Sequence, residues 1–500
     1  MDVTLESAHD LGHRTLAGGS WLFFSRLGQK GLFLIQISVL ARLLDPRAFG
    51  LMDLANLAAT AIGIFIYTGV EFALIQKPDL KNDDIHTAWW VMLGRHSLIA
   101  VTLAILANSI SVFFKSPEAV PVLVAFALMQ PILGLISASP ILLQRNLQFR
   151  KLFFMESGSS LLGLFIGIIA ALFLHNVWAL VFSLLSTHLT YLLLSYMLHP
   201  YRPKWVISRA CIHKFTGYGL WALGSNILWF VSSQGSSAFA GWMFGMTALG
   251  LYQMAARFAL FPSIHLNAVF ESALMPAYSM IQDDRNRLSQ AFLKSISLAS
   301  TVIMGITALV ALGLPHLLTL LLGDHWAEAS SLVMPIAIAG GAQSLLRTGT
   351  PLYFGTGHPR FQFLLDLVQA ITTVLFLWPL GRAFGLLGLP FGMLGGALCS
   401  IPIWGFGIRR TTNCSLVDIF RSLIPPVVGV GTMFMVFFIG QGPGLTETKA
   451  LFAIFWHFTL IGISAFAFLL IIELGQRFIP NYAPLSDLKS FFKNKWQASR

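Results

Sequence analysis

The chain has 500 residues, of which 56% are hydrophobic and only 11% are charged. Soluble domains carry about 25% charged residues, so this composition excludes an ordinary soluble protein and indicates a polytopic membrane protein. The formal net charge of +11 would suggest a nucleic acid partner in a soluble chain, but here most basic residues lie between apolar runs, where they act as topology signals, and we expect no nucleic acid partner.

Apolar runs follow one another along almost the whole chain. Each spanning run must satisfy its own backbone hydrogen bonds, and these runs are too long and continuous for barrel strands, so we expect an all-α fold. The N-terminus lacks the pattern of a removable signal peptide. The pattern predicts about fourteen transmembrane helices, each of about 20 residues or more, at 17–40, 48–74, 87–113, 119–142, 154–174, 177–198, 216–240, 247–275, 290–314, 329–353, 361–381, 386–408, 417–440 and 450–473.

The distribution of Lys and Arg over the loops predicts the orientation. With the N-terminus in the cytoplasm, most loop cations, among them Arg150 and Lys151, fall on the inner side, and both termini are cytoplasmic. All outward loops are then short and leave no external domain for catalysis. The longest internal linker, 199–215, carries Trp205 and Ile207 among its cations, so we expect it to lie on the anionic lipids of the inner leaflet.

Two halves of the chain are related by a shift of 200 residues. Six helices separate the copies, so the repeat is parallel, and in transporters such halves place the substrate between them. The shift aligns these landmarks without a gap: Gly19 with Gly219, Trp21 with Trp221, Gly50 with Gly250, and Glu71 with Glu271. The expected domains are two pseudo-symmetric six-helix lobes at 1–198 and 216–410, the linker at 199–215, a helix pair at 411–474 and a basic cytoplasmic tail at 475–500.

Cations inside the predicted helices are the main functional candidates. A charged group at bilayer depth costs about 2.5 kcal/mol or more, so it normally faces a cavity or a partner. Arg26 and Lys30 lie four residues apart on one helix face, where a bound anion would relieve their repulsion. A cavity lined by such groups would attract a multiply charged anion such as a pyrophosphate. The candidates for this role are Arg26, Lys30, Arg95, Arg257 and Arg347.

Each of these cations also has a structural interpretation. It can form an ion pair with a membrane carboxylate or snorkel to an interface, as we expect for Lys294. The carboxylates within reach of such pairing are Asp53, Glu71, Glu271 and Asp366. Glu71 and Glu271 are also candidates for ion coupling, because a carboxyl at membrane depth can carry a coupling proton; the alternative is that both are simply solvated at helix ends.

The sequence carries no motif for catalysis, a metal or a cofactor. Cys211, Cys399 and Cys414 match no metal or redox spacing, and no Walker, H-E-x-x-H or nucleophile-elbow pattern occurs. We therefore expect a protein that is not an enzyme, with transport driven by a proton or sodium gradient or by the membrane potential. Prolines within several apolar runs, among them Pro140 and Pro262, predict bends that can act as hinges.

Several stretches resemble those of a known family. They are "LARLLDPRAFGLMDLA" (40–55), "GVEFALIQKPDL" (69–80), "ILLQRNLQFRKLFFMES" (141–157), "ALGLYQMAARFALFPSIHL" leading into "LMPAYSMIQDDRNRLSQAFLKSISL" (248–298), and "YFGTGHPRFQFLLDL" (353–367). This set resembles the bacterial polysaccharide, or lipid-linked oligosaccharide, flippases of the multidrug/oligosaccharidyl-lipid/polysaccharide exporter superfamily.

The resemblance implies a two-lobed bundle around a cationic cavity in the bacterial inner membrane. A polyprenyl-pyrophosphate-linked glycan would enter from the cytoplasmic leaflet and leave to the periplasmic one, for exopolysaccharide, capsule or lipopolysaccharide biosynthesis, with a polysaccharide polymerase or export complex as a partner. Arg26 and Arg257 match positions where relatives place cavity arginines, and the extra helix pair would form a groove for the lipid tail. Lys30, Arg95 and Arg347 are added on physical grounds alone.

Three other functions remain open. A multidrug efflux antiporter of the same superfamily commonly has an acidic site in its first helix, where this chain has Arg26 and Lys30, which would repel an organic cation. A membrane polysaccharide polymerase or ligase would be an enzyme, and such enzymes tend to carry a large external loop. A non-transporting scaffold of an export complex is disfavoured by the repeat and the membrane charges.

Overall fold

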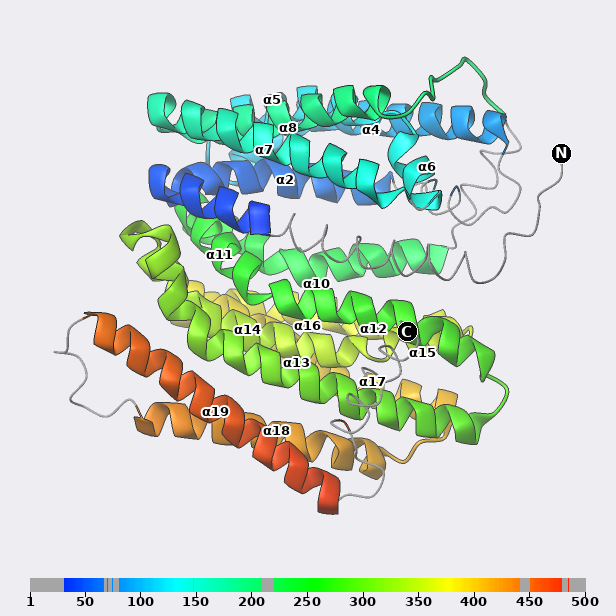
Figure 1. Cartoon of the computed structure of the whole chain (residues 1–500), viewed down its shortest axis with the longest axis vertical. Coiled ribbons are helices and arrows are strands. Elements are labelled where there is room, and N and C mark those ends of the chain that lie inside the picture. Colours follow the sequence, from blue (N-terminus) through cyan, green and yellow to red (C-terminus); the bar gives the residue numbers. More distant parts are fainter. Residues whose placement is uncertain are drawn as a thin grey trace. The chain divides into compact units, whose positions relative to one another are not determined.

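The computed structural model of the chain describes residues 31–66, 70, 74, 81–146, 148–208, 220–440, 450–478 and 484. Every regular element within them is a helix (Figure 1), which confirms the predicted all-α fold. Nine helical segments of this part of the chain are long and apolar enough to cross a membrane, or up to eleven if each bent pair is one span. The total of fourteen stays a prediction, because parts of the first, second and seventh predicted helices lie outside the described residues.

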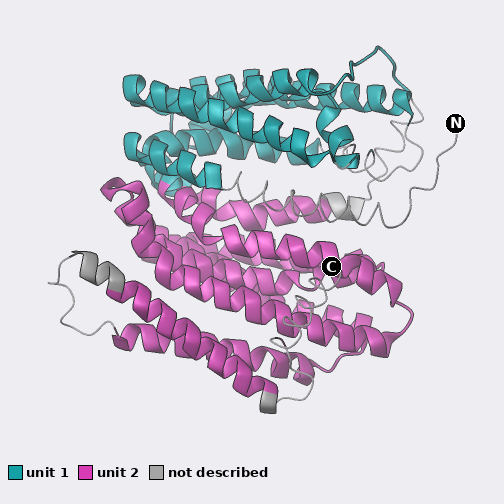
Figure 2. Ribbon diagram, in the orientation of Figure 1, with its two compact units in different colours: residues 1–223, 241–250 teal, residues 224–240, 251–500 magenta. Residues whose placement is uncertain are grey.

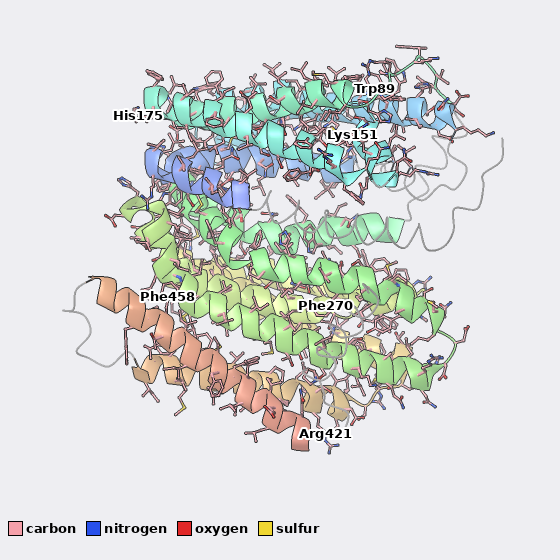
Figure 3. All side chains as sticks on the ribbon, viewed as in Figure 1. Trp89, Lys151, His175, Phe270, Arg421 and Phe458 are labelled. Carbon is pink, nitrogen blue, oxygen red and sulfur yellow. The ribbon has the colours of Figure 1, made fainter. Side chains whose placement is uncertain are left out.

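The chain divides into two compact units (Figure 2). Unit 1 comprises residues 1–223 and 241–250, and unit 2 comprises residues 224–240 and 251–500. The predicted lobe, linker and tail boundaries stay predictions. Large apolar side chains remain exposed on both units (Figure 3), such as Phe173 at 82% and Met280 at 86%. Apolar exposure on this scale is expected of helices that face lipid.

Unit 1 is a bundle of antiparallel helices. The helix pairs α7 with α8 and α4 with α5 pack along their lengths, and α2 contacts α4, α5 and α8. The start of α2 is fixed locally, because the backbone N–H of Ala48 donates to Asp45 at 2.9 Å and Pro46 occupies the first turn. The elements are α2 (Pro46–Phe65), α4 (Asn82–Phe113), α5 (Ala119–Gly134), α6 (Ser139–Arg145), α7 (Phe149–Leu174) and α8 (Val177–Met197), with a shorter apolar helix at Gly31–Leu43.

Unit 2 holds the remaining helices, although the units divide α10 and α11 between them. The predicted break at 381–386 is confirmed: α16 ends at Phe384, and Gly385 takes a positive φ of 62° that a residue with a side chain rarely adopts. The elements are α10 (Leu220–Phe244), α11 (Met246–Ala259), α12 (Phe261–Met280), α13 (Arg285–Leu322), η1 (Asp324–Trp326), α14 (Ala327–Arg347), α15 (Thr350–Gly355), α16 (Pro359–Phe384), η2 (Gly385–Leu387), α17 (Gly388–Thr412), α18 (Leu416–Gly440) and α19 (Ala450–Phe478).

Two of the predicted spans bend sharply. The bend between α5 and α6 is 51°, and that between α11 and α12 is 48°. Pro140 and Pro262 lie in the first turns of α6 and α12, directly after the bends, where a proline fits without losing a backbone hydrogen bond. Pro131 and Pro335, by contrast, lie inside single helices. The bends predicted at Pro140 and Pro262 are therefore present; their use as hinges stays a prediction.

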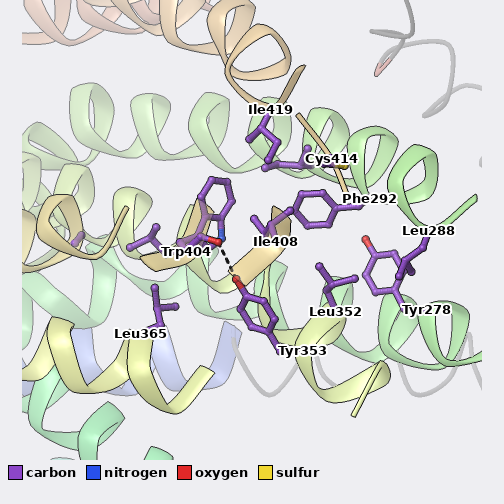
Figure 4. Close-up of a cluster of buried hydrophobic side chains, with 13 residues drawn as sticks. Tyr278, Leu288, Phe292, Leu352, Tyr353, Leu365, Trp404, Ile408, Cys414 and Ile419 are labelled. Carbon is purple, nitrogen blue, oxygen red and sulfur yellow. Dashed lines mark hydrogen bonds between the residues drawn. The ribbon is translucent and has the colours of Figure 1, made fainter. Parts of the chain in front are cut away.

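A cluster of buried side chains joins seven helices of unit 2, α12 to α18 (Figure 4). Tyr278 of α12, Phe292 of α13, Tyr353 of α15, Leu365 of α16 and Trp404 of α17 are all less than 7% exposed. The Tyr353 hydroxyl donates to the Trp404 carbonyl at 2.9 Å, which satisfies a polar group that burial would otherwise penalise. This core joins the helices that carry Glu271, Arg347 and Asp366.

The last two helices dock on α13 through an aromatic ring. Methyl groups added to Gly305 of α13 or Gly429 of α18 would both collide with the ring of Phe468 from α19. The ring therefore fills a space that exists because both positions lack a side chain, as is common in membrane helix packing. It is 6% exposed and belongs to a second core cluster with Leu312, Met433 and Phe437.

A contact within unit 1 has the symmetry of the sequence repeat. A methyl group on Gly50 of α2 would overlap the carbonyl oxygen of Met246, and one on Gly250 of α11 would overlap the carbonyl oxygen of Pro46. The shift of 200 residues exchanges Gly50 with Gly250 and Pro46 with Met246. A contact that exchanges its own members is the mark of a two-fold relation, so the packing supports the repeat inferred from the sequence.

This contact predicts an asymmetry between glycines. Gly50→Ala or Gly250→Ala forces a methyl group against backbone, and overpacking of this kind costs about 1–3 kcal/mol, so the purified variants should unfold at lower temperature. Gly94→Ala in α4 is the matched control, because nothing lies within 4 Å of its added methyl group. Thermal unfolding in detergent measures the difference, and equal midpoints for all three variants would contradict the contact.

Candidate functional site

The structure describes four of the seven predicted site residues. Arg95 lies on α4 of unit 1, while Arg257 on α11, Glu271 on α12 and Arg347 on α14 belong to unit 2. Arg26, Lys30 and Glu71 lie outside the described residues. The geometry available for analysis is therefore that of each unit by itself.

Arg347 is surrounded by side chains from three other helices of unit 2. Its Nε lies 3.5 Å from Oε1 of Glu271, and its guanidinium carbon lies 5.3 Å from the ring centroid of Trp229 on α10. It also acts electrostatically on Asp366 of α16. The ion pair that the sequence left open as the alternative role for Arg347 is thus present.

The Arg347 pair is loose and accessible. The side chains of Arg347 and Glu271 are 30% and 33% exposed, and Oε1 of Glu271 accepts no hydrogen bond in the described part of the chain. A charge-assisted hydrogen bond would bring the two atoms to about 2.7–2.9 Å. Glu271 thus lowers the free-energy cost of placing the Arg347 charge at membrane depth, and it does so without a bidentate hydrogen bond to the guanidinium group.

Asp366 belongs to a tighter network. Its Oδ1 accepts from Gln362 Nε2 at 2.9 Å, and Gln362 Oε1 in turn accepts from the Thr350 hydroxyl at 3.0 Å. Ser225 of α10 also donates to the Asp366 carboxylate. Asp366 is 6% exposed, so its oxygens are used within the protein. The network joins α10, α15 and α16 around Arg347 and is a structural feature.

Arg257 lies at the bend between α11 and α12. It occupies the last turn of α11 and is half-buried. The helix dipole places partial negative charge at this end of α11, so the positive charge of Arg257 is favoured there. One turn earlier, Gln253 Nε2 lies 3.4 Å from Gln234 Oε1 of α10. The bend thus gathers polar groups of α10 and α11 beside Arg257.

Arg95 lies within a polar region of unit 1 that the sequence did not predict. It is half-buried in α4, and the next residue, His96, places Nδ1 3.0 Å from Gln130 Oε1 of α5. His188 of α8 interacts electrostatically with His96. Gly134 permits this close approach, because a methyl group there would collide with Leu93 and His96. The local sequence around His188 does not indicate a partner 92 positions away.

The described part of the basic linker is attached to α4. The Lys204 backbone N–H donates to Nδ1 of His86 at 3.2 Å, and the Tyr201 hydroxyl lies 2.9 Å from the same nitrogen. Trp90 Nε1 donates to the Lys204 carbonyl at 2.9 Å, and its ring lies 4.3 Å from that of Trp205, centroid to centroid. Trp205 is itself 78% exposed. An exposed tryptophan beside lysine is typical of a segment at the membrane interface.

The surroundings of the linker are positively charged. Burial lowers the pKa of His199, and the charges of Lys151 and Arg202 lower it further. His199 is therefore expected to be neutral at neutral pH, so Lys151 and Arg202 carry the positive charge of this surface.

In sequence, the chain is similar to proteins of polysaccharide biosynthesis. The succinoglycan biosynthesis transport protein ExoT of Rhizobium meliloti is 26% identical over 386 residues, which cover 77% of this chain and 75% of that protein. The lipopolysaccharide biosynthesis protein WzxC of Escherichia coli is 23% identical over 427 residues, 84% of this chain and 82% of the relative.

Two solved structures share the fold. The lipid II flippase MurJ in an inward closed conformation has a TM-score of 0.66 at 13% identity, over 92% of this chain and 99% of that one. An inward-facing multidrug resistance transporter of the MATE family has a TM-score of 0.60 at 18% identity, over 77% of this chain and 95% of that one. These likenesses establish the polytopic helical fold that both transporters have.

The match to a family model is more direct. It covers residues 39–331, more than half of the chain, and the family is described as polysaccharide biosynthesis protein. The matched region includes Arg95, Arg257 and Glu271, and it runs from the helical stretch before α2 into α14. The chain belongs to the polysaccharide biosynthesis protein family.

Proposed function

We propose that the protein flips a polyprenyl-pyrophosphate-linked oligosaccharide repeat unit across the bacterial inner membrane by alternating access. The product would serve exopolysaccharide, capsule or lipopolysaccharide biosynthesis. The observation that carries the proposal is the likeness, over 77% of the chain, to a protein named for succinoglycan biosynthesis transport. The accessible arginines at membrane depth supply the chemistry, because a guanidinium binds phosphate oxygens in a bidentate manner.

The Arg347–Glu271 ion pair offers one way to offset the positive charge of Arg347. In the absence of substrate, Glu271 compensates Arg347 from 3.5 Å. An incoming pyrophosphate offers shorter, bidentate contacts and would displace the carboxylate from the guanidinium. Glu271 would then act as a competitor of the substrate, in addition to its candidacy, with Glu71, for coupling to an ion.

The membrane potential alone can drive such a reaction. A pyrophosphate diester is negatively charged, and a potential that is negative inside favours its outward movement by about 2.3 kcal/mol per charge and 100 mV. The energy source then needs no nucleotide and no cofactor. A proton or sodium gradient is the alternative source, with Glu71 and Glu271 as candidate carriers.

The remaining assignments follow from this proposal. Both termini would face the cytoplasm, with the 199–208 segment on the anionic lipids of the inner leaflet, where Trp205 and its neighbouring cations fit the interface. A polysaccharide polymerase or export complex would take the flipped unit. The fold alone does not separate this function from multidrug efflux, since a multidrug transporter shares it. The predicted site residues comprise five cations and two carboxylates, and this excess of positive charge favours an anionic substrate.

Replacing the family-matched arginines tests the substrate site. Arg26→Ala and Arg257→Ala should abolish surface polysaccharide in cells while the protein remains in the membrane, because each removes a predicted pyrophosphate contact. Arg26→Lys keeps the charge but loses the bidentate fork, so export should fall. Arg421→Ala is the control, since this side chain is 63% exposed and pairs with Asp418 only at 4.0 Å. Full polysaccharide in either alanine variant would refute the role assigned to that arginine.

Exchanging the charges of the Arg347 pair separates stability from binding. Arg347→Gln alone should destabilise the protein by roughly 1 kcal/mol, a modest loss because the pair is partly solvated. The double variant Arg347→Glu with Glu271→Arg restores an ion pair and should recover the unfolding temperature, yet transport should stay impaired because the cation has moved. Recovery of both unfolding temperature and transport would mean that Arg347 is only a structural partner of Glu271.

A vesicle assay tests the driving force. Purified protein in liposomes with labelled polyprenyl-pyrophosphate glycan should flip it faster when a potassium diffusion potential is imposed with valinomycin, in the direction that moves the anion toward the positive side. A pH gradient without a potential should have little effect. Acceleration by the pH gradient alone, lost in Glu71→Gln or Glu271→Gln, would instead assign proton coupling.

A further inference from the structure

A cationic hollow of unit 2 shares no lining residue with the Arg347 network. It is a cavity of about 600 Å³ lined by Arg285, Phe406, Arg409, Arg410 and Asn413. Arg285 begins α13, and the other two arginines belong to the last turn of α17. Helices more than 100 positions apart in sequence thus bring three guanidinium groups to one hollow.

The three arginine side chains have few partners within the hollow in the described part of the chain. Arg285 Nη1 approaches Asn413 Oδ1 at 3.4 Å, and Arg410 lies 6.0 Å from the ring centroid of Phe406. Among the residues that the structure describes, no carboxylate lines the hollow. Asp284 is engaged as the N-cap of α13, where it accepts from two backbone N–H groups, at 3.1 Å and 3.0 Å. Three positive charges around one space repel each other, and a bound anion would replace this repulsion with attraction to each arginine.

The helix ends sharpen this argument. Arg409 and Arg410 are favoured at the C-terminal end of α17, where the helix dipole is negative. Arg285, in the first turn of α13, lies at the positive end of its helix, where a cation is disfavoured. Asp284 at the N-cap offsets part of this cost, and a negative group in the hollow would offset more of it.

An apolar surface leads along α17 to the arginines. Phe391, Leu398 and Phe406 are 45%, 53% and 56% exposed, at spacings that place them on one face of the helix. From Phe391 to Phe406 this face is about 22 Å long at the rise of an α-helix, most of a hydrocarbon core of about 30 Å. Exposed apolar residues over this length face acyl chains, so the arginines that follow lie at the level of the headgroups.

We propose that Arg285, Arg409 and Arg410 form a binding site for the phosphate of an anionic phospholipid, with its acyl chain along the exposed face of α17. The three guanidinium groups hold the phosphate diester, and Phe406 contacts the first part of the chain. The lipid is a resident ligand of unit 2 and is not the transported molecule, so this site goes beyond the proposed transport function.

Lipid counting tests the site. The purified full-length protein in detergent is titrated with phosphatidylglycerol or phosphatidylcholine, and bound lipids are counted by native mass spectrometry. Arg285→Gln, Arg409→Gln and Arg410→Gln should each weaken phosphatidylglycerol binding roughly fivefold, and the triple variant roughly a hundredfold. Phosphatidylcholine binding should not change. Phe406→Gln, which keeps every charge, should also weaken phosphatidylglycerol binding.

The matched control removes the same charge elsewhere. A triple variant of the exposed arginines Arg360, Arg382 and Arg421 should bind phosphatidylglycerol within about twofold of the wild type, since its charge loss is equal and only its place differs. Equal losses in the two triple variants would overturn the site in favour of a diffuse charge effect. Unfolding temperatures of both variants, measured in the same detergent, show whether each is folded.

Two further arms identify the source of the phosphate. Inorganic pyrophosphate should compete weakly, because it lacks the acyl chain; full displacement of phosphatidylglycerol by pyrophosphate at equal concentration would overturn the lipid assignment. In liposomes of phosphatidylcholine alone, the Arg285/Arg409/Arg410 variant should flip the polyprenyl-pyrophosphate glycan at the wild-type rate. Loss of flipping there would place these arginines on the substrate path and overturn the proposal, whereas failure of the wild type to flip the glycan contradicts only the proposed function.

Discussion

A charge at membrane depth needs a partner, and the helices of unit 2 are arranged around that need. Arg347 reaches Glu271 at 3.5 Å, stacks near Trp229 and faces Asp366, so groups from α10, α12 and α16 share its cost. Asp366 is held by Gln362, whereas Oε1 of Glu271 accepts no hydrogen bond from the residues that the structure describes. The network therefore has one fixed carboxylate and one that can yield to a ligand, and this combination both stabilises the empty protein and leaves the arginine usable.

The lack of side chains at a few positions sets where the helices meet. Gly50 and Gly250 allow α2 and the start of α11 to touch at the backbone, and the pair is exchanged by the repeat. Gly305 and Gly429 admit the Phe468 ring that docks the last two helices. Lipid gives no hydrophobic driving force between helices, so close packing at small residues must supply the attraction. The same physics thus holds the repeat contact and the added helix pair.

Most of the fold could be predicted from the sequence, because apolar length and turn residues are local properties. The run from 386 to 408 became α17, and Gly385 ended the preceding helix as the glycine predicts. Helix α13 begins at Arg285, before its apolar run, since Asp284 caps it and polar residues continue the helix beyond the lipid. Partners of membrane charges were not predictable in the same way. His96 and Gln130 meet because α4 and α5 pack at Gly134, and no local pattern encodes that register.

Arg409 and Arg410 each have two roles, one in setting the membrane orientation of the chain and one in the proposed lipid site. In the sequence they are topology signals, since cations beside an apolar run set its orientation. In the structure they lie at the end of an exposed apolar face of α17. They share a hollow with Arg285, which begins α13 more than 100 residues earlier in the sequence. Orientation requires only that the charges stay on one side of the membrane, and it is indifferent to their clustering. Clustering against electrostatic repulsion needs a further cause, and an anion at headgroup depth supplies one.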